Sequence, residues 1–203
     1  MQPGSGDIAC VTLGATKAKT LTMDDMSTIE IRRTDEMRLT PQFEAEIARL
    51  LEEPFRGVFG TRTFFQNRHH VRFTAHKDEM LVGHLALGLR AVRLGDKLMD
   101  VIGIAEVGVD KDHRGEGIAR SLVMAALEEG RASPASFALL FGDAKIYGSM
   151  GFAKATNTIT STKFEAARTG ETVTETEHPL MVCPLTGRTW NNTPDLDLAG
   201  FRF

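Results

Sequence analysis

The sequence lacks the features that place a protein in a membrane or around a structural metal. Only two of its 203 residues are cysteines, Cys10 and Cys183, and they form no metal-ligand spacing. We therefore expect two free thiols in a reducing compartment and no bound metal. No apolar run approaches the roughly 18 residues of a membrane-spanning helix. A lipoprotein signal is excluded because Asp7 interrupts the stretch before Cys10 and no cationic segment precedes it. The expected location is the cytoplasm.

A surplus of basic residues is also missing. The formal net charge is -3, which does not favour a nucleic acid as partner. With 42% apolar and 25% charged residues, the composition is that of a globular protein that can bury a full core. Residues 1–26 are rich in small and polar residues and show no period, so we expect a disordered leader there. One domain is expected over 27–183, with a C-terminal extension, 184–203, packed on the same domain.

The periodicity of the sequence predicts an α+β fold. Thr40 and Pro41 supply the cap and first residue of a helix to about residue 53. Residues 54–68 fit either a short helix or a loop. From 71 to 76 apolar and polar residues alternate, as in a strand with one apolar and one polar face. Further strands are expected at 28–33, 80–93, 98–109, 136–141, 153–163 and 180–183, and helices at 118–130 and 142–150.

The order of these elements indicates how the sheet is connected. The early strands are joined by hairpin-length turns and should pair antiparallel. A strand, the helix ending at Gly130 and another strand then form a parallel crossover. The predicted architecture is a mixed, mostly antiparallel sheet with one parallel β-α-β crossover and flanking helices.

One turn carries the features of an anion site. It leads from a strand into a helix, where the first N–H groups have no intrahelical partner and the helix dipole is positive. Gly115 and Gly117 let the backbone approach a ligand, and Arg114 adds a cationic fork, so the turn suits a pyrophosphate. Glu116 must point to solvent for this to hold. The turn reads His113-Arg114-Gly115-Glu116-Gly117-Ile118-Ala119.

Other phosphate-binding turns fit less well. A Rossmann turn needs a small residue where Arg120 stands, and a P-loop needs a Gly-Lys-Ser/Thr that does not occur. The pattern Arg-x-x-Gly-x-Ala at residues 114–119 instead resembles the signature of the GNAT superfamily of N-acetyltransferases. The segment Tyr147 to Phe152 is similar to that superfamily's Tyr-x-x-x-Gly-Phe, and the resemblance covers about residues 28–183.

The resemblance implies transfer of an acetyl or other acyl group from acyl-CoA, with acetyl-CoA as the expected donor, to a primary amine. The pantetheine arm of the donor would lie along the end of a splayed strand, where Gly108 suits close approach of the backbone or forms a bulge. An N–H near Val107 would polarise the thioester carbonyl. The implied donor-binding residues are Val107, Gly108, Val109, Arg114, Gly115, Glu116, Gly117, Ile118 and Ala119.

Three residues are candidates for proton transfer. By resemblance, Tyr147 protonates the departing thiolate; the alternative is a core aromatic with its hydroxyl satisfied. Glu106 ends an apolar strand, and we expect burial to raise its pKa toward that of a useful base. Its alternative is a salt bridge with Arg90 or Arg93. His84 is the rival base, because the usual pKa of histidine lies near neutrality.

A second resemblance leaves the donor and acceptor open. Residues 84–96 and 184–190 look like segments of the nodulation protein A acyltransferases, and the layout is similar to that of the aminoglycoside 2′-N-acetyltransferases. One alternative is therefore fatty acyl transfer from acyl carrier protein to an amino sugar, with an apolar channel through residues 54–68. Another is a non-catalytic acyl-CoA-binding module. The sequence identifies neither the acceptor amine nor the translation start, and it leaves open whether the chain forms a homodimer.

Overall fold

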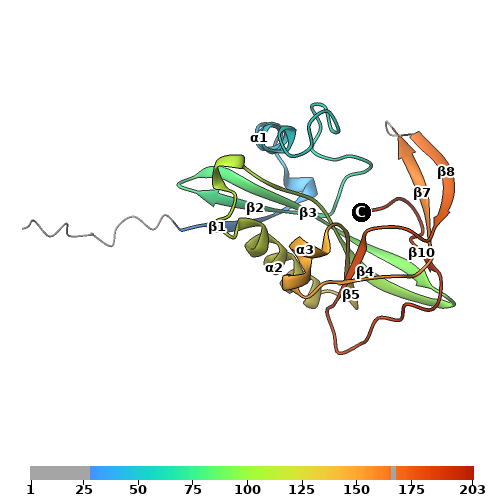
Figure 1. Ribbon diagram of the computed structural model, residues 1–203. Coiled ribbons are helices and arrows are strands. Elements are labelled where there is room, and N and C mark those ends of the chain that lie inside the picture. The colour runs from blue at the N-terminus through green and yellow to red at the C-terminus, as the bar shows by residue number, and fades with distance from the viewer. Residues whose placement is uncertain (1–27, 166–167) are drawn as a thin grey trace, which may run out of the picture.

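The structure is a computed structural model that describes residues 28–165 and 168–203 (Figure 1). Cys10 and the leader predicted at 1–26 lie outside the described residues. The strands are β1 (Glu30–Asp35), β2 (Val71–Lys77), β3 (Met80–Leu94), β4 (Lys97–Val109), β5 (Phe137–Phe141), β6 (Ala153–Lys154), β7 (Ile159–Glu165), β8 (Arg168–Glu175), β9 (Leu180–Pro184) and β10 (Leu196–Asp197). The helices are α1 (Pro41–Glu52), α2 (Ile118–Arg131) and α3 (Ala144–Tyr147), with short 3-10 turns at Glu36–Arg38, Lys111–His113 and Gly148–Met150.

The strands of the described residues form one mixed sheet. Its order is β6-β9-β5-β4-β3-β10-β7-β8, and β2 and then β1 continue from the first half of β3. Within this described sheet, only β4–β5 and β10–β7 pair in parallel. The parallel β4-α2-β5 unit is the predicted crossover. The α+β class and the mostly antiparallel sheet are therefore confirmed.

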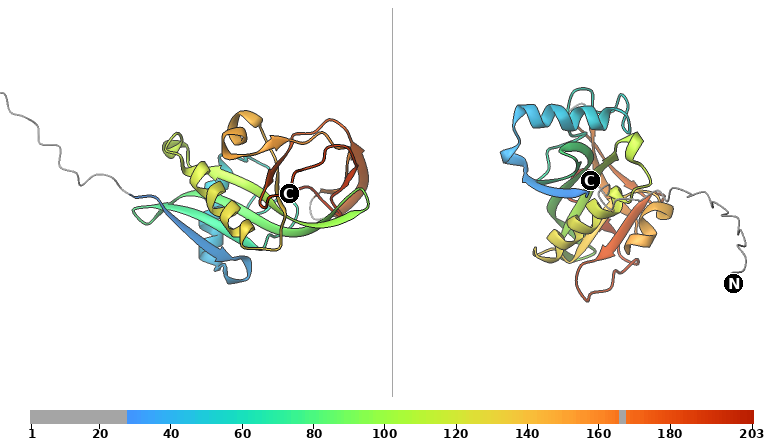
Figure 2. Two further views of the ribbon diagram at one scale, coloured as in Figure 1. Left: turned by 90° about the horizontal axis from the view of Figure 1, so that it is seen from below. Right: turned by 90° about the vertical axis from the view of Figure 1, so that its left-hand side faces the viewer.

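Helices cover both faces of the sheet, with α1 on one side and α2 on the other (Figures 1 and 2). The predicted start of α1 is confirmed: Pro41 is its first residue, and Thr40 Oγ1 accepts a hydrogen bond from Phe43 N at 3.2 Å. The predicted end of α2 is not. Gly130 lies within the helix, and a Cβ there would be 2.4 Å from Ile102 Cδ1. This glycine therefore allows close packing of helix on sheet rather than capping.

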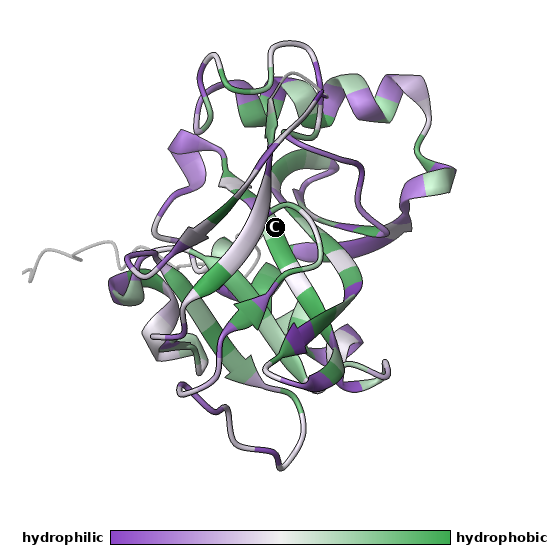
Figure 3. Cartoon of the chain, turned by 90° about the vertical axis from the view of Figure 1, so that its right-hand side faces the viewer, coloured by the Kyte–Doolittle hydropathy of each residue, from purple (hydrophilic) through white to green (hydrophobic). Residues whose placement is uncertain are grey.

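Strand β2 is buried on both faces. The side chains of residues 71–76 alternate as predicted, yet all six residues are buried. Helix α1 covers the polar face, where the ring of Phe43 stacks on His76 at 6.2 Å. As a result Arg72, which has no exposed surface, must find its partners inside the protein. Figure 3 shows mainly hydrophobic strands at the centre of the molecule and mixed colours along α1.

Residues 54–68, which fitted either a short helix or a loop, contain turns and no helix.

The C-terminal part of the chain adds β8 and β10, which the sequence pattern did not predict. The hairpin β7–β8 stands apart from the helices at the right of Figure 1. Strand β10 pairs with β3 and β7, which brings residues 201–203 back between the hairpin and the loop after α1. In the described residues, no helix has the length and apolar character to span a bilayer.

Candidate active site

The predicted anion-binding turn has the open backbone that its glycines suggest. Gly115 and Gly117 have φ values of +84° and +80°, which favour glycine, and a Cβ at either would meet no atom within 4 Å. The first helical hydrogen bond of α2 runs from Ser121 N to Gly117 O at 3.0 Å. The three N–H groups before Ser121 therefore have no acceptor within the helix. The side chain of Ile118 is buried, so only its main chain can face a ligand.

Charged side chains surround this turn in pairs. Glu116 accepts hydrogen bonds from Lys77 Nζ at 2.9 Å and lies 3.1 Å from His113 Nδ1. The bond from Lys77 holds the pKa of Glu116 below its usual value. The negative charge of Glu116, which would by itself weaken an anion site, is thus balanced by Lys77. Arg114, the predicted phosphate ligand, forms an ion pair with Glu53 at the end of α1.

Strands β4 and β5 separate where the resemblance places the pantetheine arm. Their parallel pairing ends at Gly103 and Leu139, although β4 continues to Val109. A bulge in β4 sets Glu106 and Val107 opposite a single residue of β3, and Glu106 has φ +54°. The following Gly108 has another use: a Cβ there would lie 3.0 Å from Leu51 and 3.3 Å from Pro54. On that face, therefore, the absence of a side chain leaves room for α1 and for Pro54 beyond its end.

Tyr147 is half-buried at the end of α3. Its ring packs edge-on against Phe152, with centroids 6.1 Å apart. A Cβ at Gly142 would come within 2.6 Å of this ring, so glycine makes room for it. Burial raises the pKa of the hydroxyl above its usual value. Within the described residues the hydroxyl has no hydrogen-bond partner, and Tyr147 lines a cavity together with Glu106.

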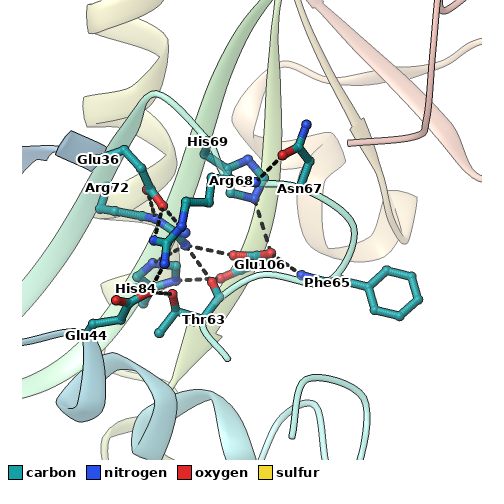
Figure 4. Close-up of polar contacts among 10 residues, drawn as sticks. All are labelled: Glu36, Glu44, Thr63, Phe65, Asn67, Arg68, His69, Arg72, His84 and Glu106. Carbon is teal, nitrogen blue, oxygen red and sulfur yellow. Dashed lines mark hydrogen bonds and ion pairs between the residues drawn. The ribbon is translucent and has the colours of Figure 1, made fainter. Parts of the chain in front are cut away.

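Glu106 belongs to a buried charge network centred on Arg72 (Figure 4). Arg72 Nη1 donates to Glu106 Oε2 at 2.8 Å, and Arg72 Nε donates to Glu36 Oε2 at 2.5 Å. The other Glu106 oxygen, Oε1, accepts from Phe65 N at 2.9 Å and lies 3.1 Å from His69 Nε2. The partner of Glu106 is therefore Arg72, not the Arg90 or Arg93 that the sequence suggested. The network also includes Arg68, Glu44 and Thr63.

The expectation that burial raises the pKa of Glu106 is wrong. Burial does act in that direction and is the largest single influence. The contact with His69 and the charges of His69 and Arg72 together outweigh it, so the pKa of Glu106 is lowered from its usual 4.5. The carboxylate is consequently ionised across the neutral range, even though its side chain is only 5% exposed.

His84 is fully buried and both its ring nitrogens are engaged. Nδ1 lies 2.9 Å from Glu106 O, and Nε2 lies 3.2 Å from Arg72 Nη1. A proton on Nδ1 satisfies both contacts, because Nε2 then accepts from Arg72. Burial, and then the charge of Arg72, lowers the pKa of His84 to about 3. The ring therefore stays neutral, and it does not line the cavity that Glu106 and Tyr147 share.

That cavity has a volume of 590 Å³ and lies where β4 and β5 separate. Its lining residues come mainly from β4, β5, α3, the loop after α1 and the C-terminal segment. His69 is among them: its buried Nε2 approaches Glu106 Oε1 at 3.1 Å as an ion-pair contact, although the angle is not that of a hydrogen bond. Within those same residues, no three His, Cys, Asp or Glu side chains gather as a metal site would require.

The sequence reasoning missed three parts of this site. It assigned no role in the site to His69, to Arg72 or to residues 201–203. One signal was available for Arg72: a charged residue in an otherwise strand-like run. No local signal identifies its partners, since Glu36 and Glu106 lie 36 and 34 residues away in the chain.

Comparison with known proteins finds one matching family model and several solved structures of similar fold. The model of the acetyltransferase (GNAT) domain family matches residues 38–155. A GNAT family N-acetyltransferase from Escherichia coli (YhbS), solved in complex with CoA, is 19% identical with a TM-score of 0.57. This match covers 87% of the present chain and 93% of the other. An acyl-CoA N-acyltransferase from Pseudomonas aeruginosa is 18% identical with a TM-score of 0.52, covering 77% and 99%.

A third match is to a longer protein. Eis1 from Mycobacterium abscessus is 18% identical with a TM-score of 0.54, and the match covers 66% of the present chain and 33% of Eis1. At these identities the solved structures support the fold. Among proteins of curated function, none matches the sequence.

Proposed function

The chain belongs to the GNAT acetyltransferase family, and from this premise we propose that it transfers an acetyl or other acyl group from acyl-CoA to a primary amine. Family membership makes it an acyltransferase of the N-acetyltransferase type with an acyl-CoA as donor. One observation carries the proposal: Glu106, Val107 and Tyr147 line a single cavity, where β4 and β5 separate. The Escherichia coli neighbour, which was solved in complex with CoA, supports a CoA thioester as the donor.

The donor's diphosphate fits the start of α2. The unbonded N–H groups there point out of the helix, and Gly115 and Gly117 leave space beside them. Arg114 would exchange its ion pair with Glu53 for the phosphate. The pantetheine arm would then follow β4 past Gly103, where β5 no longer pairs with it.

The reaction that fits this cavity is direct acyl transfer. The amine nitrogen attacks the thioester carbonyl carbon, a C–N bond forms, and the N–H of Val107 stabilises the oxyanion. The C–S bond then breaks, and the thiolate takes the proton of Tyr147. Because burial raises the pKa of Tyr147, the hydroxyl is protonated at neutral pH and available for this step.

The proton of the amine needs an acceptor at the other side of the reacting carbon. Glu106 is ionised but, with its lowered pKa, is a weak base by itself. His69 lies 3.1 Å from it in the cavity wall, so we assign the pair as the acceptor: the imidazole takes the proton, directly or through a water, and the carboxylate stabilises the imidazolium. His84, neutral and buried, is assigned the positioning of Arg72 and of the bulge at Glu106.

A panel of amines with acetyl-CoA and free-thiol detection tests the proposal. We expect thiol release that depends on the amine, and CoA binding by calorimetry. Tyr147→Phe should retain binding while turnover falls. If CoA binds but no amine releases thiol, catalysis is refuted and the chain is an acyl-CoA-binding module.

A further inference from the structure

The active-site cavity is lined by an unusual number of aromatic side chains. They come from three separate parts of the chain: the loop after α1, the end of β5 and the C-terminal segment. The six phenylalanines are Phe55, Phe59, Phe65, Phe141, Phe201 and Phe203. Phe55 and Phe59 also contact each other, with ring centroids 4.8 Å apart. Such surface is favourable for an apolar ligand and unfavourable to leave in water.

The phenylalanines of the loop after α1 lie where the acceptor would bind, not where the phosphates of the donor would bind. Phe65 N donates to Glu106 Oε1 at 2.9 Å, so its loop is fixed to the carboxylate of the proposed proton acceptor. The molecule that loses its proton to that pair must therefore pass Phe65. The mouth of the cavity is apolar too: Val58 and Phe65 are each 44% exposed, and Ile146 is 53% exposed.

The C-terminal segment is held in place as a wall of the cavity. The guanidinium of Arg90 lies 4.3 Å from the ring centroid of Phe201 and 4.4 Å from that of Phe203, and it also donates to Phe201 O. Phe203 lies directly on the backbone of Gly103, where a Cβ would be 1.6 Å from its Cδ1. The position of this ring thus depends on glycine at 103.

The charged groups of the cavity already have protein partners. Arg202 pairs with Glu175, and Asp143 accepts from Lys145 N at 2.8 Å. Glu106 is held by Arg72. Few charged groups are therefore left to bind additional charges on a polar substrate.

From this lining we infer that the acceptor is a primary amine whose remaining part, its body, is apolar and either aromatic or branched. The inference rests on the proposed function and names the substrate class of the same site. The amine lies beside Glu106 and His69, and its apolar body packs among Phe65 and the C-terminal phenylalanines. The aromatic faces also favour the approach of a protonated amine before it loses its proton.

The test compares kcat/KM for 2-phenylethylamine, ethanolamine and glucosamine with acetyl-CoA. We expect 2-phenylethylamine to be preferred by at least about tenfold, since even one methylene in an apolar pocket is worth about 10–200-fold. Phe65→Ser keeps the backbone N–H and should remove about tenfold of this preference with little effect on ethanolamine. Phe64→Ser is the matched control, because Phe64 contacts Arg62 and Arg68 and does not line the cavity.

A second variant tests the wall without removing an aromatic residue. Gly103→Ala should displace the ring of Phe203 and lower kcat/KM for 2-phenylethylamine more than for ethanolamine. Preference for ethanolamine or glucosamine would overturn the inference and leave acyl transfer standing. Preference for decanoyl-CoA over acetyl-CoA that Phe65→Ser abolishes would also overturn it, because the lining would then hold the acyl chain. Turnover of no amine, with CoA bound, would refute the proposed function itself.

Discussion

Arg72 is the residue whose loss should change both the stability of the protein and the pH dependence of its activity. It is fully buried, and Arg72→Met replaces its guanidinium with an apolar group. Two buried carboxylates then lose a partner. Glu36 keeps an ion pair with Arg68 at 3.0 Å, whereas Glu106 keeps no arginine and has only His69 and a backbone N–H.

The size of the stability effect follows from these remaining partners. Removing one side of a buried ion pair costs about 3–5 kcal/mol. Because Glu36 remains paired, we expect the lower end, about 3 kcal/mol, which for a chain of this size lowers the melting temperature by roughly 6–12 °C. Thermal unfolding followed by circular dichroism measures it. The matched control is Arg33→Met, which breaks an exposed pair with Glu129 and should cost less than about 1 kcal/mol.

The pH profile gives a readout that a purely structural role would not change. In the native protein the lowered pKa of Glu106 stabilises the fold above the usual carboxyl pKa, and that stabilisation is lost as pH falls through the lower, folded-state value. Without Arg72, one of the charges that lower the pKa of Glu106 is removed while burial still raises it, so the pKa of Glu106 rises. The acid limb of kcat/KM should therefore move to higher pH. An unchanged acid limb, or a melting temperature within about 2 °C of the wild type, would refute the reasoning.

Three further predictions concern the donor and the leaving group. Gly117→Asp places a side chain at φ +80° and a negative charge at the helix start, so calorimetry should find CoA affinity reduced by at least about tenfold; unaltered affinity would exclude this turn as the phosphate site. Glu53→Gln frees Arg114 from its ion pair and should tighten CoA binding about two- to fivefold at low salt, a gain that vanishes at 1 M salt. Tyr147→Phe should lower kcat by about 100-fold with little change in the KM for acetyl-CoA, and a kcat within about twofold of the wild type would remove Tyr147 from catalysis.

The sequence predicts those elements whose hydrophobic pattern is local. The cap at Thr40 and the apolar stripe that follows fix α1, and the glycines before Ile118 mark the start of α2. Strand β8 was not predicted because nearly all of Arg168–Glu175 is exposed and lacks an apolar face. Its pairing depends on β7, not on a buried stripe of its own.

The sequence predicted those parts of the site in which a single residue, named by its position in a motif or strand, carries the chemical role. Glu106 and Tyr147 line one cavity, as direct transfer requires, but the direction of the shift in the pKa of Glu106 was not predictable from burial alone. It depends on Arg72 and His69, which reach Glu106 only because α1 and its loop cover the polar face of β2. Sequence periodicity carries no information about which polar face a helix will cover.

The separation of β4 and β5 has a consequence for the lifetime of the protein in the cell. A ligand that lies between the strands past Gly103 and Leu139 contacts the native state and has no such site on the unfolded chain. At a concentration 100 times its dissociation constant it adds about 2.7 kcal/mol to the free energy of unfolding. We therefore expect degradation to accelerate when the CoA supply falls, and deuterium uptake by the amides of residues 104–109 to slow when CoA is added.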